Sequence, residues 1–284
     1  MDWRVRHVTT YRYAETVDLA NHLLHLTPRA LPHQQVLAAS ISCAPAAVLR
    51  TDGTDHFGNP VTRLSIDRAH DRFEVVAEAL VRTAFPPPPP AAGTLPWEAV
   101  AAAPPAEAAE FAFPSPMLPE HAGARDYAAQ SFPPGRPALL GLLELNGRIH
   151  RDFAFRPGVT GVATPVSQVL AQRAGVCQDF THLMLTGLRG LGLPARYVSG
   201  YIRTRPAPGS LSLRGADQSH AWVGCWLGAE HGWVDLDPTN DLVAAEEHVV
   251  LGWGRDFGDV SPLRGIILGG GKHKLDVAVE LAPA

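Results

Sequence analysis

The chain has 284 residues, of which 46% are hydrophobic and 18% are charged, with a formal net charge of −4. Together with a mean hydropathy of −0.01, this profile excludes a disordered chain or a membrane protein. The absence of a basic run argues against nucleic acid or anionic membranes as partners. No stretch approaches the ~20 apolar residues of a membrane-spanning helix. The opening segment, MDWRVRHVTTYRY, lacks the apolar core of a signal peptide. We therefore expect a cytoplasmic globular protein of one large domain or two ordinary ones.

The cysteines and histidines give little support for a metal site or a disulfide framework. The three cysteines, Cys43, Cys177 and Cys225, are widely spaced and never form a CxxC pair. Of the 13 histidines, only His22 and His25 have a helix-type ligand spacing, and no carboxylate or cysteine cluster lies near them. We expect neither a metal nor an organic cofactor.

Residues 1–85 have the pattern of a β domain. Polar and apolar residues alternate in 3–13, within 36–48 and in 60–66, and FEVVAEALV at 73–81 is a further candidate strand. Turn-forming residues such as TDGTDHFGNP separate these stretches. Several short strands in succession predict a small β-sandwich domain over residues 1–85, with Cys43 in the core of one strand.

The next segment, residues 86–136, is rich in alanine and proline. FPPPPPAAG at 85–93 continues neither a sheet nor a helix, because consecutive prolines form a stiff polyproline II segment. We expect residues 86–136 to be a surface linker with one or two short helices, serving as a spacer rather than as a proline-motif ligand.

Residues 137–284 change from helical to strand patterns. ALLGLLELNGRIHRDFAF predicts a helix that enters a turn, and TPVSQVLAQRAG at 164–175 predicts a second helix. A third helix begins at Cys177 and ends near Gly190. Candidate strands follow at 195–202, 219–227 and 232–238, and KLDVAVELA near the end alternates again. A helix followed by a run of strands predicts an α+β fold, with a second domain over residues 137–284.

Cys177 lies at the start of the third predicted helix, in the segment AGVCQDFTHL. Unpaired backbone N–H groups and the helix dipole favour an anion there, so the position suits a thiolate nucleophile and could hold an oxyanion. Cys43 and Cys225 lack this setting. Asp179 is expected to cap the helix, and His182 lies off the face of the cysteine. The alternative for Cys177 is a small buried side chain in a packed helix, the commoner role of a free cysteine.

A cysteine nucleophile needs a base and a group that orients the base. In SHAWVGCWL, strand alternation sends Cys225 and its apolar neighbours to the core, and sends His220 to the opposite face beside tryptophans that could wall a cleft. In GWVDLDP, Asp235 and Asp237 share one face, so either can reach the ring if the two strands form a hairpin. Alternation does not choose between them, and each can equally be a solvated carboxylate beside a turn.

Several segments, in this order, resemble the bacterial transglutaminase-like family. They are YRYAETVDLANHLLHLTPR (11–29), AGVCQDFTHLMLTGLRGLGLPARYVSGY (174–201), SHAWV (219–223), GWVDLDPTN (232–240) and GRDFGDVSPLRGIILGGG (254–271). The first is similar to the β domain that often precedes the core in this family. The resemblance implies a papain-like transglutaminase core over 137–284, in which a helix carrying the cysteine packs on an antiparallel sheet.

The resemblance also implies a catalytic triad of Cys177, His220 and Asp237. It favours Asp237 because the family's aspartate follows a tryptophan by four positions within a D-x-T turn, as in WVDLDPT. We assign Trp222 and Trp233 as candidate substrate-binding residues. Many animal members supply an oxyanion donor from a tryptophan ahead of the cysteine. Here no tryptophan lies between Trp97 and Cys177, so the second oxyanion donor is not identified.

The expected function is cysteine-dependent acyl transfer on a peptide or protein substrate, through a thioester at peptide or glutamine-type amide bonds. We expect hydrolysis, as by a peptidase or amidase. The first alternative is transfer of the acyl group to an amine, which would crosslink proteins, and the second is a non-catalytic binding module with the same fold. The sequence gives no indication of the oligomeric state.

Overall fold

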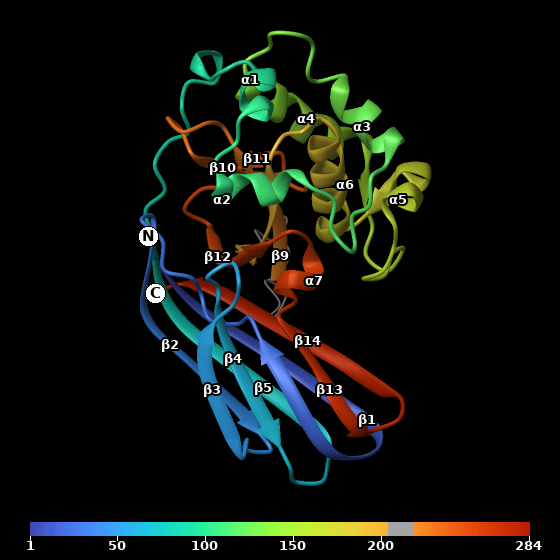
Figure 1. Ribbon diagram of the computed structural model, residues 1–284. Coiled ribbons are helices and arrows are strands. Elements are labelled where there is room, and N and C mark those ends of the chain that lie inside the picture. The colour runs from blue at the N-terminus through green and yellow to red at the C-terminus, as the bar shows by residue number, and fades with distance from the viewer. Residues whose placement is uncertain (204–218) are drawn as a thin grey trace, which may run out of the picture.

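The computed structural model describes residues 1–203 and 219–284 and contains a folded-over β-sheet followed by a helix-rich core (Figure 1). The first region is built on the long strand β1 (Asp2–Leu24), in which polar and apolar residues alternate as the sequence predicts. The other strands of this sheet are β2 (Gln34–Ala44), β3 (Leu49–Thr54), β4 (Pro60–Ile66), β5 (His70–Thr83), β13 (Leu263–Gly269) and β14 (His273–Pro283).

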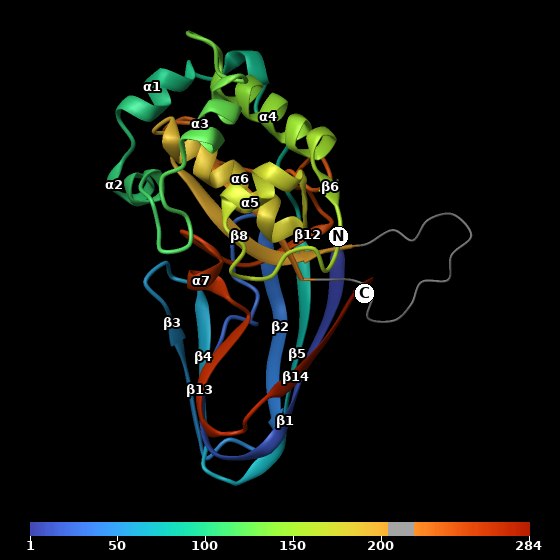
Figure 2. The ribbon, with the colours of Figure 1, turned by 90° about the vertical axis from the view of Figure 1, so that its right-hand side faces the viewer.

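Strand β1 changes partners along its length. Its first half pairs with β5 and β14, and its second half pairs with β4 and β13, with a register irregularity between Arg12 and Val17. The two halves of the sheet therefore face each other as two layers (Figure 2). A core that includes Leu24, Ile66 and Phe73 fills the space between them. The predicted sandwich is confirmed, with both layers belonging to one continuous sheet.

The last two strands of the chain lie in this first region. β13 and β14 pair antiparallel with β1, although the sequence analysis assigned them to the segment 137–284. Alternation in KLDVAVELA predicts a strand but carries no information about which distant strand it will pair with. The chain therefore leaves the first sheet, builds the core and returns to the sheet at its end (Figure 1).

The alanine- and proline-rich segment forms short helices that pack on the core. Its helical elements bury side chains such as Val100, Phe111 and Tyr127. They are η1 (Ala91–Gly93), α1 (Trp97–Ala102), α2 (Ala106–Ala109), η2 (Glu110–Ala112) and α3 (Ala122–Ala129). The sequence predicts one or two short helices here, and the segment contains more, with their apolar faces packed into the core.

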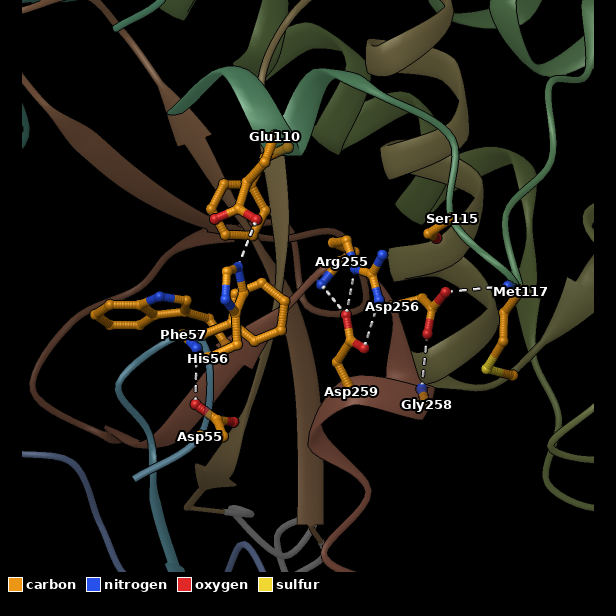
Figure 3. Close-up of polar contacts among 12 residues, drawn as sticks. Asp55, His56, Phe57, Glu110, Ser115, Met117, Arg255, Asp256, Gly258 and Asp259 are labelled. Atoms are coloured by element: carbon orange, nitrogen blue, oxygen red, sulfur yellow. Dashed lines mark hydrogen bonds and ion pairs between the residues drawn. The ribbon is translucent and has the colours of Figure 1, made fainter. Parts of the chain in front are cut away.

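Polar contacts tie this segment to both regions (Figure 3). Glu110 pairs with His56, in the loop between β3 and β4 of the first region, at 3.1 Å. Asp256 accepts hydrogen bonds from the backbone N–H groups of Met117 and Gly258, at 3.0 and 2.8 Å. The segment is thereby fixed at the junction of the two regions.

The second region is a layer of helices on a five-stranded antiparallel sheet, in the order β11-β10-β9-β8-β12. Helix α6 (Cys177–Gly190) packs on this sheet through Phe180, Leu183 and Met184, which meet Val223 and its neighbours in one core. The other elements are α4 (Ala138–Asp152), β6 (Ala154–Phe155), α5 (Val166–Gln172), β7 (Ala174–Gly175), β8 (Ala195–Ile202), β9 (Ser219–Trp226), β10 (Trp233–Asp237), β11 (Leu242–Val243), β12 (His248–Gly254) and α7 (Phe257–Val260). The predicted α+β fold class is confirmed.

A buried cluster joins β1 of the first sheet to β8 and β12 of the second sheet. Trp3 of β1 packs in one cluster with Tyr201 of β8 and Val249 of β12. The Tyr201 hydroxyl is 2.9 Å from Nδ1 of His7, whose pKa burial lowers to about 4, so this ring is neutral at neutral pH. Within residues 1–203 and 219–284, none of the helices has the length and apolar character needed to cross a bilayer.

Candidate active site

Cys177 is the first residue of α6, as the sequence predicts. The start of the helix is held by Asp179, whose Oδ2 accepts hydrogen bonds from the Val176 backbone N–H at 2.8 Å and from the Thr160 hydroxyl at 2.7 Å. Burial raises the pKa of Asp179, with these two hydrogen bonds opposing the shift. The apolar face of α6 anchors the helix in the core, while the half-buried Cys177 lines an open cleft. The first-turn N–H groups of α6 therefore lie at the thiol.

His220 reaches the same cleft from β9. Gly200 of β8 lies directly opposite His220 in the ladder. A side chain at Gly200 would meet the Trp222 ring at 2.4 Å and the Val249 carbonyl oxygen at 2.2 Å, so only glycine fits between these strands. The missing side chain therefore lets the Trp222 ring of β9 lie across β8 near Gly200, beside the strand position of His220.

Asp237, at the end of β10, holds the histidine. Its Oδ2 lies 2.8 Å from Nε2 of His220, and its Oδ1 accepts the backbone N–H groups of Thr239 at 2.9 Å and Asn240 at 3.3 Å. The Asp237 side chain is completely buried. The other ring nitrogen of His220, Nδ1, is left for Cys177, which is a second hydrogen-bond partner of the ring. The structure thus brings all three predicted residues together.

The electrostatics of these residues favour charged His220 and charged Asp237. Burial by itself lowers the pKa of His220, but hydrogen bonds and charge from Asp237 and Cys177 outweigh burial and raise it. Burial opposes ionisation of Asp237, yet hydrogen bonds from His220, His248 and Asn240 hold its pKa well below the usual range. The protonated form of the imidazole is therefore favoured between Cys177 and Asp237.

The cleft beside Cys177 and His220 has a volume of about 1310 Å³. One wall comes from the loop after β10 and from the start of β12, including Asn240, Ala244 and His248. Phe155 and residues Phe85–Pro88 also line this cleft. The polyproline stretch that the sequence predicts as a domain boundary therefore also lines the candidate active site.

Comparison with known proteins agrees with this geometry. Residues 3–82 match the family described as the bacterial transglutaminase-like N-terminal region, and residues 133–238 match the transglutaminase-like superfamily. An uncharacterized protein of Mycobacterium tuberculosis is 39% identical, with 99% of this chain and 92% of that protein covered.

The chain belongs to the transglutaminase-like superfamily.

This transglutaminase-like chain is also similar to a solved structure and, over part of its length, to an enzyme. A solved structure from Cytophaga hutchinsonii, provisionally described as a cysteine protease, has the same fold, with a TM-score of 0.77 at 20% identity, covering 99% of this chain and 90% of that one. A protein-glutamine gamma-glutamyltransferase of Pseudomonas aeruginosa is 36% identical over 94 residues, which is 32% of this chain and 14% of that enzyme.

Two residues of the transglutaminase-like site were missed by sequence reasoning. Asn240 donates from its side chain to Oδ2 of Asp237 at 2.6 Å, and His248 places Nε2 3.5 Å from the same oxygen. Nδ1 of His248 accepts the Ala245 backbone N–H at 3.2 Å, so Nε2 carries the proton and donates to the carboxylate. The sequence DPTN signals a turn in which an aspartate accepts following N–H groups, and could have indicated Asn240. Nothing near His248 in the sequence signals its role.

The two tryptophans assigned as candidate substrate-binding residues do not stand beside Cys177. Neither lies among the described residues that line the cleft of Cys177. Trp222 is completely buried behind His220, with Nε1 donating to Oδ2 of Asp235 at 3.0 Å. Trp233 packs edge-on against Trp226, at a ring distance of 5.5 Å. Strand alternation assigns Trp222 and Trp233 to the correct side of the sheet, but other residues pack over that side as well.

The remaining candidate residues have structural contacts. Cys225 is buried in the core, as predicted, and burial raises its pKa well above the usual value. His182 is buried and accepts the Phe257 backbone N–H at 3.3 Å. His22 stacks on Phe73 with ring centroids 4.1 Å apart, and His25 contacts Asp55 at 3.2 Å. Among residues 1–203 and 219–284, no group of three or more potential metal ligands is assembled.

Proposed function

We propose that this chain is a cysteine-dependent acyl-transfer enzyme that attacks peptide or glutamine-type amide bonds and hydrolyses them. The observation that carries the proposal is the arrangement of the half-buried Cys177 at the start of α6, next to a His220 ring that is held by the buried Asp237. Membership of the transglutaminase-like superfamily supports it.

In the proposed first half-reaction, Nδ1 of His220 takes the proton of Cys177, and the sulfur attacks the amide carbon. The negative charge that develops on the carbonyl oxygen is stabilised by backbone N–H groups of the first turn of α6. The imidazolium then gives its proton to the departing amine or ammonia, which leaves a thioester on Cys177. Asp237 keeps the Nε2–H of the ring directed away from the sulfur throughout.

In the second half-reaction, His220 removes a proton from water, which attacks the thioester and releases a carboxylic acid and the free thiol. Water requires no binding site of its own, so hydrolysis needs only the groups already described. Amine transfer is the second candidate, because part of the chain is similar to the Pseudomonas aeruginosa protein-glutamine gamma-glutamyltransferase. An amine that outcompetes water at the thioester would make the chain a transferase.

The test is a peptide library incubated with the wild-type chain, with the Cys177→Ala variant as the blank and Cys43→Ala as the matched control. Mass spectrometry should find new peptide ends or conversion of glutamine to glutamate with wild type and Cys43→Ala only. A dansylated amine added to the same reaction distinguishes transfer, since its incorporation in place of hydrolysis would favour the second candidate. Products that form equally with Cys177→Ala would overturn both candidates, and the absence of any product with wild type would leave a binding module.

A further inference from the structure

A second pocket lies on the same face of the core sheet as His220. It has a volume of about 480 Å³ and is lined by Arg196 of β8, Trp233 and Asp235 of β10, and Trp253 of β12. Residues Phe85–Pro89, which we call the proline segment, form another wall. Part of the proline segment, together with Val243 and Ala244, also lines the cleft of Cys177, so the two cavities are neighbours.

The guanidinium of Arg196 is held between two indole rings. Its central carbon lies 3.7 Å from the ring centre of Trp253 and 4.3 Å from that of Trp233. The Arg196 residue is only 8% exposed. Because the guanidinium stacks on aromatic rings through its face, its planar edge, which carries the N–H donors, is the part that can bind a ligand.

This edge has almost no partner in the part of the chain that the structure describes. The nearest acidic oxygen, Oδ1 of Asp235, is 3.9 Å away, and the other oxygen of Asp235 already accepts from Trp222. Nε of Arg196 is buried without a hydrogen-bond partner. A buried, unpaired donor on a charged group is costly, so the arrangement is poorly explained by folding alone.

A second unpartnered atom lies at the same pocket. Nε2 of His33 is buried without a hydrogen bond, and its ring packs on Phe85 with centroids 4.2 Å apart. The charges of Asp235 and Arg196 both act on this ring, which places His33 near them. Gly224 makes room for Arg196 and Asp235, because a side chain at this position would meet Nε of Arg196 at 2.8 Å and Oδ1 of Asp235 at 2.9 Å.

The distance from this pocket to the candidate catalytic residues suits one extended peptide. Arg196 and Gly200 lie four positions apart on β8, and Gly200 is opposite His220. At a rise of about 3.3 Å per residue, the separation along the strand is about 13 Å. An extended peptide covers this distance in about four residues.

We propose that the Arg196 pocket binds a carboxylate of the peptide substrate, about four residues from the amide that Cys177 attacks. The ligand class follows from a stacked arginine edge with free donors, which matches a carboxylate in a two-pronged hydrogen bond. The apolar walls of the proline segment and the two tryptophans would contact the carbon chain next to it. The substrate register rests on the proposed function, whereas carboxylate binding does not.

The experiment measures binding without turnover. The full chain carrying Cys177→Ala is titrated calorimetrically with acetyl-Gln-Ala-Ala-Ala-Ala ending in a free carboxylate, and with the same peptide ending in an amide. We expect the acid to bind about tenfold or more tightly than the amide. A further Arg196→Gln change should abolish this difference. Arg6→Gln, which removes an equally charged but exposed arginine of β1, should preserve it.

Because Arg196→Gln could disturb folding, the indole N–H resonances of Trp233 and Trp253 provide a second measurement on the Arg196-containing protein. The acid peptide should shift both resonances, and the amide should shift neither. The proposal would be overturned if acid and amide bound equally, or if neither bound at millimolar concentration. It would also be overturned if Arg6→Gln lost the preference for the acid as fully as Arg196→Gln. In each case Arg196 would have a structural stacking role only. If the acid peptide shows no preference but Cys177-dependent products form, the proposed function stands and the carboxylate pocket falls. If the carboxylate binds but no Cys177-dependent product forms, the pocket stands and the proposed function falls.

Discussion

Replacing Asp237 by asparagine tests whether the carboxylate prepares His220 for chemistry. The side chain is buried, with its two oxygens accepting from Thr239, Asn240 and His220. An asparagine has one acceptor oxygen. If that oxygen keeps the Thr239 and Asn240 backbone N–H groups, its NH₂ group faces the Nε2–H groups of His220 and His248 and the side-chain amide of the exposed Asn240. The two buried histidine donors then lose their acceptor, at about 1 to 3 kcal/mol each, or about 2 to 6 kcal/mol in total.

The assay follows unfolding by urea and the rate at which iodoacetamide modifies Cys177. Because Asp237 contributes to the raised pKa of His220, its removal should slow alkylation by about tenfold or more at neutral pH. Asp235→Asn is the matched control, since it lies on the same strand and keeps an oxygen for Trp222. It should leave the alkylation rate unchanged. Equal alkylation rates in wild type, Asp235→Asn and Asp237→Asn would refute the assigned role of Asp237.

Three further outcomes are expected. Burial lowers the pKa of His7 and of His182 to about 4, so the unfolded chain takes up protons first and stability should fall as pH drops from about 6.5 to about 4. The slope is up to about 1.4 kcal/mol per pH unit for each histidine, and urea unfolding of His7→Gln should show a flatter dependence. Gly200→Ala should cost about 3 kcal/mol or more because of its contacts with Trp222 and Val249, whereas Gly161→Ala, with open space around it, should be nearly neutral in thermal unfolding. Dialysis against EDTA should leave the alkylation rate of Cys177 unchanged, and a marked slowing would contradict the expectation that the chain needs no metal.

Local patterns predicted the elements of this protein well. The apolar spacing after Cys177 gave helix α6 with its correct end at Gly190, and alternation in SHAWVGCWL placed Cys225 in the core. These predictions succeed because each depends on a single amphipathic element packing against one core. The choice between Asp235 and Asp237 could not be made in this way. In the structure, Asp237 lies at the turn, where backbone N–H groups hold it beside His220, and Asp235 binds Trp222 instead.

Predictions that depended on what covers an element were less successful. Trp222 was expected to wall the cleft because it shares the face of His220, but Ala244 and Val250 pack over it and Phe85 packs against that cluster. Alternation distinguishes two sides of a strand and cannot tell that both are buried. The pairing of β13 and β14 with β1, and the approach of His248 to Asp237, join segments far apart in the chain. Such contacts are set by the fold as a whole.

The central claim is that His220 activates Cys177 and no other cysteine. It is tested most directly by competitive alkylation at neutral pH, with the adducts on Cys43, Cys177 and Cys225 quantified by mass spectrometry in wild type and in His220→Ala. We predict that wild type is modified first at Cys177 and that His220→Ala loses this preference, leaving the partly exposed Cys43 at least as reactive. Modification of Cys177 no faster than of Cys43 in wild type, or a preference that survives in His220→Ala, would contradict the account.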